Sequence, residues 1–400
     1  MSLKPSSVLL VTPRWARDGG VGAHVMASAA LLARHGTRVV VLAARIEADE
    51  DIPGVTLYRR PELSKPDVPV AQRLGEALSF EPDVIHLHQV DDPEIARALR
   101  AAAPVVVSAH GYTACSAGAH YFRPGQECDR AHGPGCVPNM VLRGCAHTSD
   151  LPRTLTAKYR YAGRGLAALQ CADLAVSYSS AVDRHLIDNG IERRVVLPYF
   201  PTMAPVTGSG HASRRRVVFA GRVVMVKGVS ILIRAARAVD GEFVVCGDGW
   251  QLEAMRKLAR RLGVADRVRF TGWLDAQALG EELANASVVA VPSVWPEPFG
   301  LVGIEAFAAG RPVVASATGG VTDWLQDGVS GLTVRPGDAA ALAKALEQLL
   351  GDPDRQRAMG RAGRETVAAR FSPERHLQAL IDAYQAARSS WLQRGGAGAA

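Results

Sequence analysis

Two glutamates stand eight positions apart in the segment "SVWPEPFGLVGIEAFAAGRPVV", residues 293–314. Glu297 lies between two prolines, and Glu305 lies within an apolar run that ends at Gly310. An apolar segment gains no stability from either acid, so we expect both carboxylates to face a bound ligand. The alternative is that they are carboxylates placed favourably near a helix N-terminus. That explanation suits a single glutamate better than a pair framed in this way.

Two cations mark a second stretch that could do chemistry, "FAGRVVMVKGVSILI", residues 219–233. Arg222 and Lys227 are expected at the carboxyl edge of a strand, just before a helix. A phosphate bound there would gain a charge-assisted contact from each, roughly 1.5 to 3 kcal/mol apiece. The alternative is a pair of solvated surface cations.

A glycine-rich turn is the third such stretch, "VTPRWARDGGVGAHV", residues 11–25. Gly19, Gly20 and Gly22 fall between an expected strand and an expected helix. Glycines let the backbone approach a ligand, and a helix start presents unpaired N–H groups to an anion. The pattern is Gly-Gly-x-Gly, not the Gly-x-Gly-x-x-Gly of dinucleotide-binding proteins. A tight turn explains it equally well.

Short apolar runs alternate with helical patterns, and this alternation must position the residues above. Such β-rich runs are typical of parallel strands buried on both faces. They cover residues 6–12, 37–43, 82–88, 103–110, 172–179 and 193–199, and then 215–222, 242–249, 267–273, 286–293, 311–317 and 331–337. A Pro-, Gly- and Ser-rich segment between the two sets, 201–214, indicates a linker.

The sequence therefore predicts an α/β protein with two doubly wound, Rossmann-like domains that face each other across a cleft. The domains cover residues 1–200 and 215–372. A final helix is expected at 373–394, followed by a flexible Gly-rich tail at 395–400.

The composition favours a globular enzyme with an anionic partner. The chain has 400 residues, of which 48% are hydrophobic and 21% charged, and its net charge is +7. Positive charge favours nucleotide phosphates, phospholipid or nucleic acid. No basic block with interleaved aromatics occurs, so we expect no nucleic-acid partner.

A cytoplasmic location is expected, because the sequence has neither a long apolar run nor a signal-peptide pattern. The helical segment 151–170 is basic and carries two tyrosines. It could lie on the inner face of an anionic membrane. The alternative is an ordinary amphipathic helix with solvated arginines.

The carboxyl half resembles a known family through "EPFGLVGIEAFAAGRPVVASATGGVTDWLQDGVSGLTVRPGD", residues 297–338. The resemblance extends through "GRVVMVKG", "VVCGDGW" and "VRFTGWL", and more loosely through "GGVGAH" and "SAHG" in the first half. These motifs are similar to those of the retaining, nucleotide-sugar-dependent glycosyltransferases of the GT-B fold, glycosyltransferase family 4. Glu297 and Glu305 match the Glu-x7-Glu motif of that family.

The resemblance implies a role for each matching residue. The last helix would return to the amino-terminal domain. Arg222 and Lys227 would hold a diphosphate, Glu305 the ribose hydroxyls and Glu297 the transferred sugar. His110 would face the sugar as the second catalytic residue. The other implied donor-binding residues are Gly20, Gly22, Gly247, Gly249, Phe270, Gly272, Phe299, Gly300, Leu301 and Val302.

The expected reaction is transfer of a sugar from a UDP- or GDP-sugar to a polysaccharide, glycolipid or small-molecule acceptor, with retained anomeric configuration. The acceptor would attack on the same face, and the leaving phosphate would accept its proton. We expect no catalytic metal, because Asp49–Glu50–Asp51 is the only candidate acidic triplet and follows the second strand as a polar loop. Two alternatives stay open: a nucleotide-sugar epimerase of the same fold, and a non-catalytic nucleotide-sugar-binding protein.

A cysteine-rich insertion at 112–150 follows His110 and is expected to shape the acceptor pocket. Cys115, Cys128, Cys136 and Cys145 occur there with three histidines, His120, His132 and His147. Four thiolates could bind a structural zinc ion and order a loop that has little core of its own. Free thiols, disulfides and an iron–sulfur centre are the alternatives. Cys171 and Cys246 lie in apolar contexts and are expected in the core.

Overall fold

The computed structural model describes residues 4–17, 19–48, 51–115, 121–123, 126–128, 130–142, 145, 152–203 and 215–395. The chain forms two compact units. Unit 1 comprises Met1–His120, Cys128–Tyr199 and Pro373–Ala400, and unit 2 comprises Tyr121–Glu127 and Phe200–Ser372.

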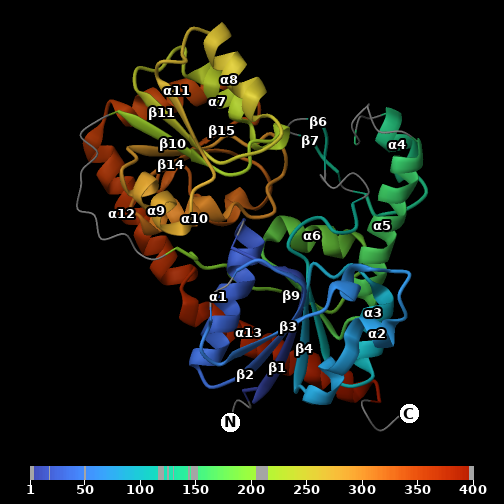
Figure 1. The fold of residues 1–400 in the computed structure, drawn as a ribbon. Helices are drawn as coiled ribbons and strands as arrows, with labels where there is room; N and C mark the ends of the chain where they lie inside the picture. Colours follow the sequence, from blue (N-terminus) through green and yellow to red (C-terminus); the bar gives the residue numbers. More distant parts are fainter. Residues whose placement is uncertain are drawn as a thin grey trace. The chain divides into compact units, whose positions relative to one another are not determined.

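Unit 1 is built on a seven-stranded parallel sheet in the order β3-β2-β1-β4-β5-β8-β9 (Figure 1). Its strands are β1 (Ser7–Trp15), β2 (Arg38–Ile46), β3 (Val55–Arg59), β4 (Val84–His88), β5 (Val105–Ser108), β8 (Leu174–Ser177) and β9 (Arg194–Val196). Its helices are α1 (Gly20–Arg34), η1 (Pro61–Ser64), α2 (Val70–Leu74), η2 (Gly75–Phe80), α3 (Pro93–Arg100), α4 (Cys136–Leu142), α5 (Pro152–Cys171), α6 (Ser180–Asp188) and α13 (Pro373–Gln393). The strand order reverses between β1 and β4, and ligands of such sheets bind beyond the carboxyl ends at that point.

Unit 2 is built on a six-stranded parallel sheet in the order β12-β11-β10-β13-β14-β15. Its strands are β10 (Arg216–Ala220), β11 (Glu242–Cys246), β12 (Val268–Gly272), β13 (Val288–Val291), β14 (Val313–Ser316) and β15 (Gly331–Val334). Its helices are η3 (Met225–Lys227), α7 (Val229–Ala235), α8 (Leu252–Arg261), α9 (Ala276–Ala284), α10 (Leu301–Ala308), η4 (Gly319–Asp323), α11 (Ala339–Leu350) and α12 (Pro353–Arg370). A short antiparallel pair, β6 (Tyr121–Arg123) and β7 (Gln126–Glu127), stands apart from this sheet.

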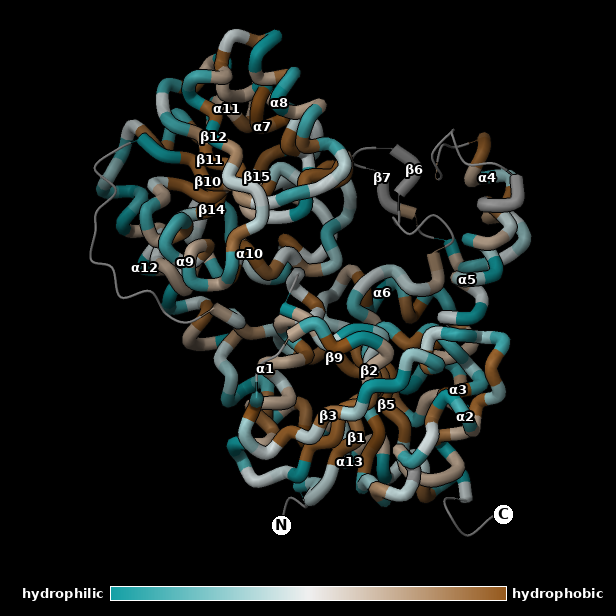
Figure 2. Tube along the Cα trace, in the orientation of Figure 1, coloured by the Kyte–Doolittle hydropathy of each residue, from teal (hydrophilic) through white to brown (hydrophobic). Residues whose placement is uncertain are grey.

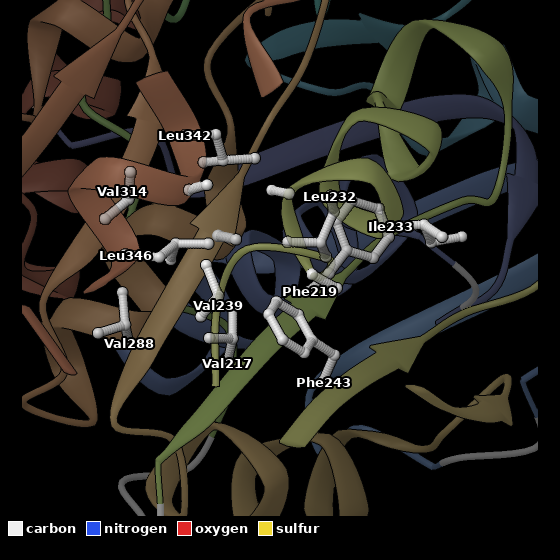
Figure 3. Close-up of a cluster of buried hydrophobic side chains, with 14 of the residues drawn as sticks. Val217, Phe219, Leu232, Ile233, Val239, Phe243, Val288, Val314, Leu342 and Leu346 are labelled. Atoms are coloured by element: carbon white, nitrogen blue, oxygen red, sulfur yellow. The ribbon is translucent and has the colours of Figure 1, made fainter. Parts of the chain in front are cut away.

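The core of unit 2 lies between its sheet and the helices that cover it. Figure 3 shows Phe219 of β10 and Phe243 of β11 packed towards Leu232 of α7. Leu342 and Leu346 of α11 belong to the same cluster and lie next to Val288 and Val314. The tube in Figure 2 is accordingly hydrophobic along the strands and hydrophilic along the outer faces of the helices. Burial on both faces explains why the strand sequences show no alternation.

The predicted fold class is confirmed, since each expected strand overlaps a strand of the structure. Most strands end two or three residues earlier than predicted, so His110 lies two residues beyond β5. β3 was not predicted. It is an edge strand with mostly half-exposed or exposed residues, and its apolar signal is correspondingly weak. The final helix, α13, packs in unit 1 against α1, β5 and β8. Residues 204–214 of the expected linker and 396–400 of the tail lie outside the described residues.

A buried carboxylate ties three helices of unit 1 together. Asp92 caps α3 by accepting from the Glu94 backbone N–H at 3.0 Å. Its other oxygen accepts from Arg73 of α2 at 2.7 Å and from Arg164 of α5 at 2.8 Å. Burial alone would raise the pKa of Asp92, but the hydrogen bonds and charges of the two arginines outweigh it and lower the pKa. The side chain of Arg73 is 3% exposed, so its charge depends on this partner.

We expect Asp92→Ala to lower the free energy of unfolding by about 3 to 5 kcal/mol, because it leaves a buried guanidinium without a counter-charge. Urea unfolding followed by circular dichroism would measure the loss. Asp354→Ala is the matched control, since Asp354 pairs with Arg357 on the surface and should cost at most about 1 kcal/mol. A loss below about 1 kcal/mol for Asp92→Ala would contradict the expected role.

Unit 1 also buries five histidines around the carboxyl ends of its central strands. His24, His86, His88 and His376 are at most 1% exposed, and His110 is half-buried. One of them, His86, is hydrogen-bonded through Nδ1 to the α13 residue Tyr384 at 2.9 Å. Burial lowers the pKa of all five, to about 4 for His376 and about 3 for His110. All five are therefore neutral at pH 7.

We expect unit 1 to lose stability as the pH falls below 6.5. Unfolded histidines take up a proton near pH 6.5, whereas the buried ones stay neutral, so the unfolded state binds more protons. Each fully buried histidine then costs about 1.4 kcal/mol per pH unit between pH 6.5 and its folded pKa. Thermal unfolding between pH 7.5 and pH 5 would record the slope.

The slope of stability against pH is proportional to the number of protons taken up on unfolding. His376→Gln should lower that number by about one, whereas the exposed control His35→Gln should leave the slope unchanged. A melting temperature that is constant between pH 7.5 and pH 5 would rule out neutral burial of these side chains.

Candidate functional site

The loops after two neighbouring central strands of unit 2 are tied together through their backbones. β10 and β13 pair in the sheet. After them, the Val294 N–H donates to the Val226 carbonyl at 2.9 Å. Gly228 has φ 71°, and a Cβ there would stand 1.9 Å from the Pro292 carbonyl oxygen, so only glycine fits. The sequence motifs "GRVVMVKG" and "VPSVWPEPFG" therefore meet at one edge of the sheet.

This contact brings together two of the predicted site residues, Lys227 and Glu297. The Lys227 Nζ donates to Glu297 Oε1 at 2.7 Å and to Oε2 at 2.9 Å. Ser293 Oγ, 1% exposed, donates to the same Oε1. Glu297 is itself only 2% exposed. A buried carboxylate at this depth is stable because it has a counter-charge and a hydroxyl donor.

The pair keeps some hydrogen-bonding capacity. An ammonium group has three N–H donors, of which two reach Glu297. A carboxylate offers about four acceptor positions, of which three are used here. Counting the contacts of the described residues, one donor of Lys227 and one acceptor position on Glu297 Oε2 are left for a ligand.

The start of α10 is shaped by close backbone approaches. Gly300 precedes α10 with φ 90°, and no side chain caps the first turn. Trp324 Nε1 donates to the Phe299 carbonyl at 2.7 Å, and a Cβ on Gly303 would stand 2.2 Å from the Trp324 ring. The predicted segment Phe299–Val302 thus presents an uncapped helix N-terminus, which is suited to binding an anion.

Glu305, the second acid of the motif, has a different environment from Glu297. Its half-buried carboxylate accepts from Thr202 Oγ1 at 3.3 Å. Burial raises the pKa of Glu305 to about 7, although hydrogen bonds from Thr202 oppose the shift. The structure therefore separates the two acids chemically: Glu297 has a cationic partner, and Glu305 has a hydroxyl partner.

The remaining predicted donor-site residues of unit 2 lie at the ends of β10, β11 and β12. Arg222 is exposed. A Cβ on Gly247 would stand 1.9 Å from the Gly221 carbonyl oxygen, and one on Gly249 would stand 2.4 Å from that of Val223. The Gly247 N–H donates to the Gly272 carbonyl at 2.8 Å, which joins the ends of β11 and β12.

Two aromatic residues beside these glycines were missed by the sequence analysis. Trp250 is 71% exposed and Trp273 is 50% exposed, each directly after a predicted glycine. Large apolar side chains are seldom left this exposed without a binding partner. In the sequence, the only indication of a role at the site was that each tryptophan directly follows a predicted glycine, Gly249 or Gly272. Phe270, by contrast, packs against the core of unit 2, so its side chain contributes to stability.

The glycine turn of unit 1 is explained largely by packing. Gly19 precedes α1 with φ 99°, and Gly20 is the first residue of α1. A Cβ on Gly22 would stand 2.1 Å from the Ala16 carbonyl oxygen. The structure therefore requires Gly22 for close packing, whether or not a ligand binds there.

His110 is held by hydrogen bonds at both ring nitrogens. Nε2 is bonded to His88 Nδ1 at 3.0 Å, and Nδ1 is bonded to Tyr199 Oη at 2.9 Å. The ring also stacks on Tyr178, with centroids 4.8 Å apart. Because burial keeps its pKa near 3, this imidazole is a neutral, oriented group and not a cation at pH 7.

The cysteine-rich insertion is only partly described. Cys115, Cys128, Cys136 and Cys145 are all half-buried. Among the described residues, no three His, Cys, Asp or Glu side chains are grouped closely enough to hold a metal ion. His120 and His147 lie outside the described residues, as do Asp49 and Glu50. Cys246 is buried as predicted, whereas Cys171 at the end of α5 is only half-buried.

No helix in the described part of the chain combines the length and the apolar character needed to cross a bilayer.

Each half of the chain matches a family model of glycosyltransferases. Residues 18–199 match the family model described as Glycosyltransferase Family 4, and residues 209–366 match that described as Glycosyl transferases group 1. The chain is 30% identical to the D-inositol 3-phosphate glycosyltransferase of Mycolicibacterium smegmatis, over 96% of this chain and 90% of that protein. It is 41% identical to the GDP-mannose-dependent alpha-(1-6)-phosphatidylinositol monomannoside mannosyltransferase of Mycobacterium tuberculosis, over 40% of this chain and 44% of that protein.

Solved structures share the fold. The sucrose-phosphate synthase of Thermosynechococcus elongatus aligns with a TM-score of 0.71 at 23% identity, covering 95% of this chain and 98% of that one. Anabaena HepE in complex with UDP-glucose aligns with a TM-score of 0.68 at 19% identity, covering 94% of this chain and 99% of that one. Together with the family matches over both halves, this likeness shows that the chain is a GT-B glycosyltransferase that belongs to glycosyltransferase family 4.

Proposed function

We propose that this glycosyltransferase moves a sugar from a UDP- or GDP-sugar to an acceptor hydroxyl and retains the anomeric configuration. The observation that carries the proposal is the cation at the edge of the unit 2 sheet. Lys227 is fixed by Glu297 beside the loop that leads into the uncapped start of α10. A diphosphate is the ligand that suits a cation together with unpaired backbone N–H groups.

The leaving diphosphate is the group that these residues would stabilise. Cleavage of the sugar–phosphate bond places negative charge on the diphosphate and positive charge on the sugar. Lys227 would donate its third N–H to the diphosphate, Arg222 would add a second cation, and the amides from Phe299 to Val302 would complete the contact. Preorganised groups of this kind contribute on the order of 100- to 1000-fold each to the rate.

Glu297 and His110 would act on the sugar. The unused acceptor position on Glu297 Oε2 suits one sugar hydroxyl, and the negative charge is partly neutralised by Lys227. His110 would contribute a neutral ring held in one orientation by His88 and Tyr199. Neither residue needs to form a covalent bond, because the leaving phosphate would accept the acceptor proton on the same face. We infer that no divalent cation is required.

Gly20 and Gly22, with the backbone around Gly247, Gly249 and Gly272, are proposed to approach the donor closely. Trp250 and Trp273 flank the glycines at the ends of β11 and β12, where the base would bind. The names of the relatives support the donor class: one is GDP-mannose-dependent, and one aligned structure holds UDP-glucose. They also include enzymes named for a phosphoinositol lipid and for lipopolysaccharide core synthesis, which supports a glycolipid, polysaccharide or small-molecule acceptor.

A cytoplasmic enzyme that associates with the membrane surface is the corresponding proposal for location. Three apolar side chains of α4 are exposed: Val137 (40%), Val141 (64%) and Leu142 (80%). α4 packs against the basic helix α5, which carries Lys158 and Arg160. Exposed apolar groups beside cations suit the interface of an anionic bilayer.

The nucleotide site is tested by calorimetry with UDP, GDP and their sugars. Glu305→Ala should raise the Kd of the nucleotide that binds about 10- to 100-fold, because the variant loses charge-assisted hydrogen bonds to the ribose. Glu281→Ala is the matched control, since Glu281 is an exposed acid on α9 of the same unit. Unchanged affinity of Glu305→Ala would refute the ribose assignment, and a protein that binds no nucleotide or nucleotide sugar would refute the proposed donor.

A structural zinc ion in the cysteine-rich insertion is proposed separately, from the cysteine content of the sequence. The described cysteines are not grouped as a ligand set, so the metal would have to draw them together as it binds. Protein purified without chelators should contain about one equivalent of zinc by elemental analysis, held by Cys115, Cys128, Cys136 and Cys145. Cys128→Ala should remove the metal, whereas Cys171→Ala, which changes a cysteine outside the insertion, should retain it. Wild-type protein without zinc would leave these cysteines as thiols or disulfides.

A further inference from the structure

Thr202 is a residue that neither the motif nor the proposed mechanism uses. It is the third residue of unit 2 after the chain leaves unit 1 at Tyr199. Its Oγ1 donates to Glu305 Oε1 at 3.3 Å. Both are only partly exposed, so the contact is partly protected from water. A residue from the crossover between units thus touches the acid to which we assign the ribose.

The same short segment is also fixed on its other side. The Pro198 carbonyl accepts from His376 Nδ1 at 2.7 Å, and Tyr199 Oη is bonded to His110 Nδ1 at 2.9 Å. Both contacts lie within unit 1. The chain is therefore anchored in unit 1 up to Tyr199, three residues before Thr202.

The elements that pack against α10 supply no competing charge to Glu305. β13 and β14 carry no charged residue within their bounds. α9 contributes Glu281, which accepts from Gln277, and Glu282, which is paired with Arg269. α12 approaches α10 through Gly360 and Gly363 and carries Arg361, Arg364 and Glu365 beside them.

Of these α12 groups, Arg364 donates to the Ala309 carbonyl at the far end of α10, at 3.3 Å. Lys227, in the same unit, is engaged by Glu297. Within the described residues, only burial and Thr202 shift the pKa of Glu305: burial raises it to about 7, and the hydrogen bonds of Thr202 lower it.

We propose that Thr202 is a positioning residue of the donor site, whose hydroxyl bonds the Glu305 carboxylate and keeps it ionised for the ribose diol. The proposal rests on the proposed ribose role of Glu305. Two ribose hydroxyls donate best to an ionised carboxylate, since a protonated one has lost part of its acceptor capacity. The hydrogen bond from Thr202 stabilises the ionised form of Glu305, which binds the ribose hydroxyls more strongly than the protonated form does.

The sign of the pH dependence follows. An empty site with a raised carboxyl pKa holds part of a proton near pH 7, and ribose hydroxyls stabilise the ionised form and lower that pKa. Nucleotide binding therefore releases a proton, and affinity falls as the pH drops below about 7. Without the Thr202 hydroxyl the empty carboxyl holds its proton to higher pH, so the loss of affinity begins at higher pH.

The experiment is calorimetry with UDP and GDP at pH 6, 7, 8 and 9, in buffers of different ionisation enthalpy that count released protons. Thr202→Val keeps the shape of the side chain and removes the hydroxyl. Its Kd should rise about three- to tenfold at pH 7 and return to the wild-type value by pH 9. Thr202→Ser should restore the wild-type profile.

Two further variants separate the effects. Thr366→Val removes a hydroxyl that bonds only within α12, and should leave the profile unchanged. Glu305→Gln cannot ionise, so it reports the pH dependence contributed by the nucleotide itself.

The outcomes distinguish this inference from the proposed function. If Thr202→Val matches wild type at every pH while Glu305→Ala binds weakly, the role of Thr202 is refuted and the ribose assignment stands. Weakening by the same factor at every pH would also refute it, because a packing defect does not act through ionisation. Normal binding by Glu305→Ala would remove the ribose assignment itself.

Discussion

The ion pair between Lys227 and Glu297 is the interaction on which the proposed donor site depends. It can form only because β10 and β13 are neighbours in the sheet and their following loops touch at Gly228. Burial makes each charge dependent on the other, since a lone carboxylate at 2% exposure would be strongly disfavoured. The pair thereby holds a cation at the sheet edge before any ligand arrives. Preorganisation of this kind spares the enzyme the cost of assembling the site during the reaction.

The two acids of the motif have different surroundings, which suit Glu297 and Glu305 to the different roles proposed for them. The charge of Glu297 is balanced by Lys227, and Ser293 adds a hydrogen bond, which would make this carboxylate compatible with the proposed diphosphate. Among the described residues, the Glu305 carboxylate is bonded only by Thr202, and burial raises its pKa to about 7, so its ionised form is less favoured than that of an exposed glutamate. Eight positions along the chain thus separate a carboxylate paired with a cation from one bonded by a threonine.

At the carboxyl ends of its central strands, unit 1 buries neutral imidazoles, whereas unit 2 buries an ion pair at the corresponding edge of its sheet. His110 is fixed by His88 and Tyr199, and the neighbouring His86 and Tyr178 are both hydrogen-bonded to Ser108. Such a hydrogen-bond network fixes the orientation of the imidazole rings without adding a charge to the site. It also explains why the sequence could identify His110 from its motif and yet give no hint of its protonation state, which depends on side chains from strands and helices far apart in the chain.

The sequence by itself determined the α/β alternation, the two sheets and the segments that carry Lys227, Glu297 and Glu305, because strand burial and glycine turns leave local signals. It could not reveal the edge strand β3, whose residues are all half-exposed or exposed, or the packing of Phe270 against the core of unit 2. Only the tertiary structure decided that Lys227 pairs with Glu297, that Thr202 reaches Glu305 and that Trp250 and Trp273 stay exposed. Those contacts join residues that are far apart in the chain, and no local sequence pattern encodes the distance between two segments once the fold has brought them together.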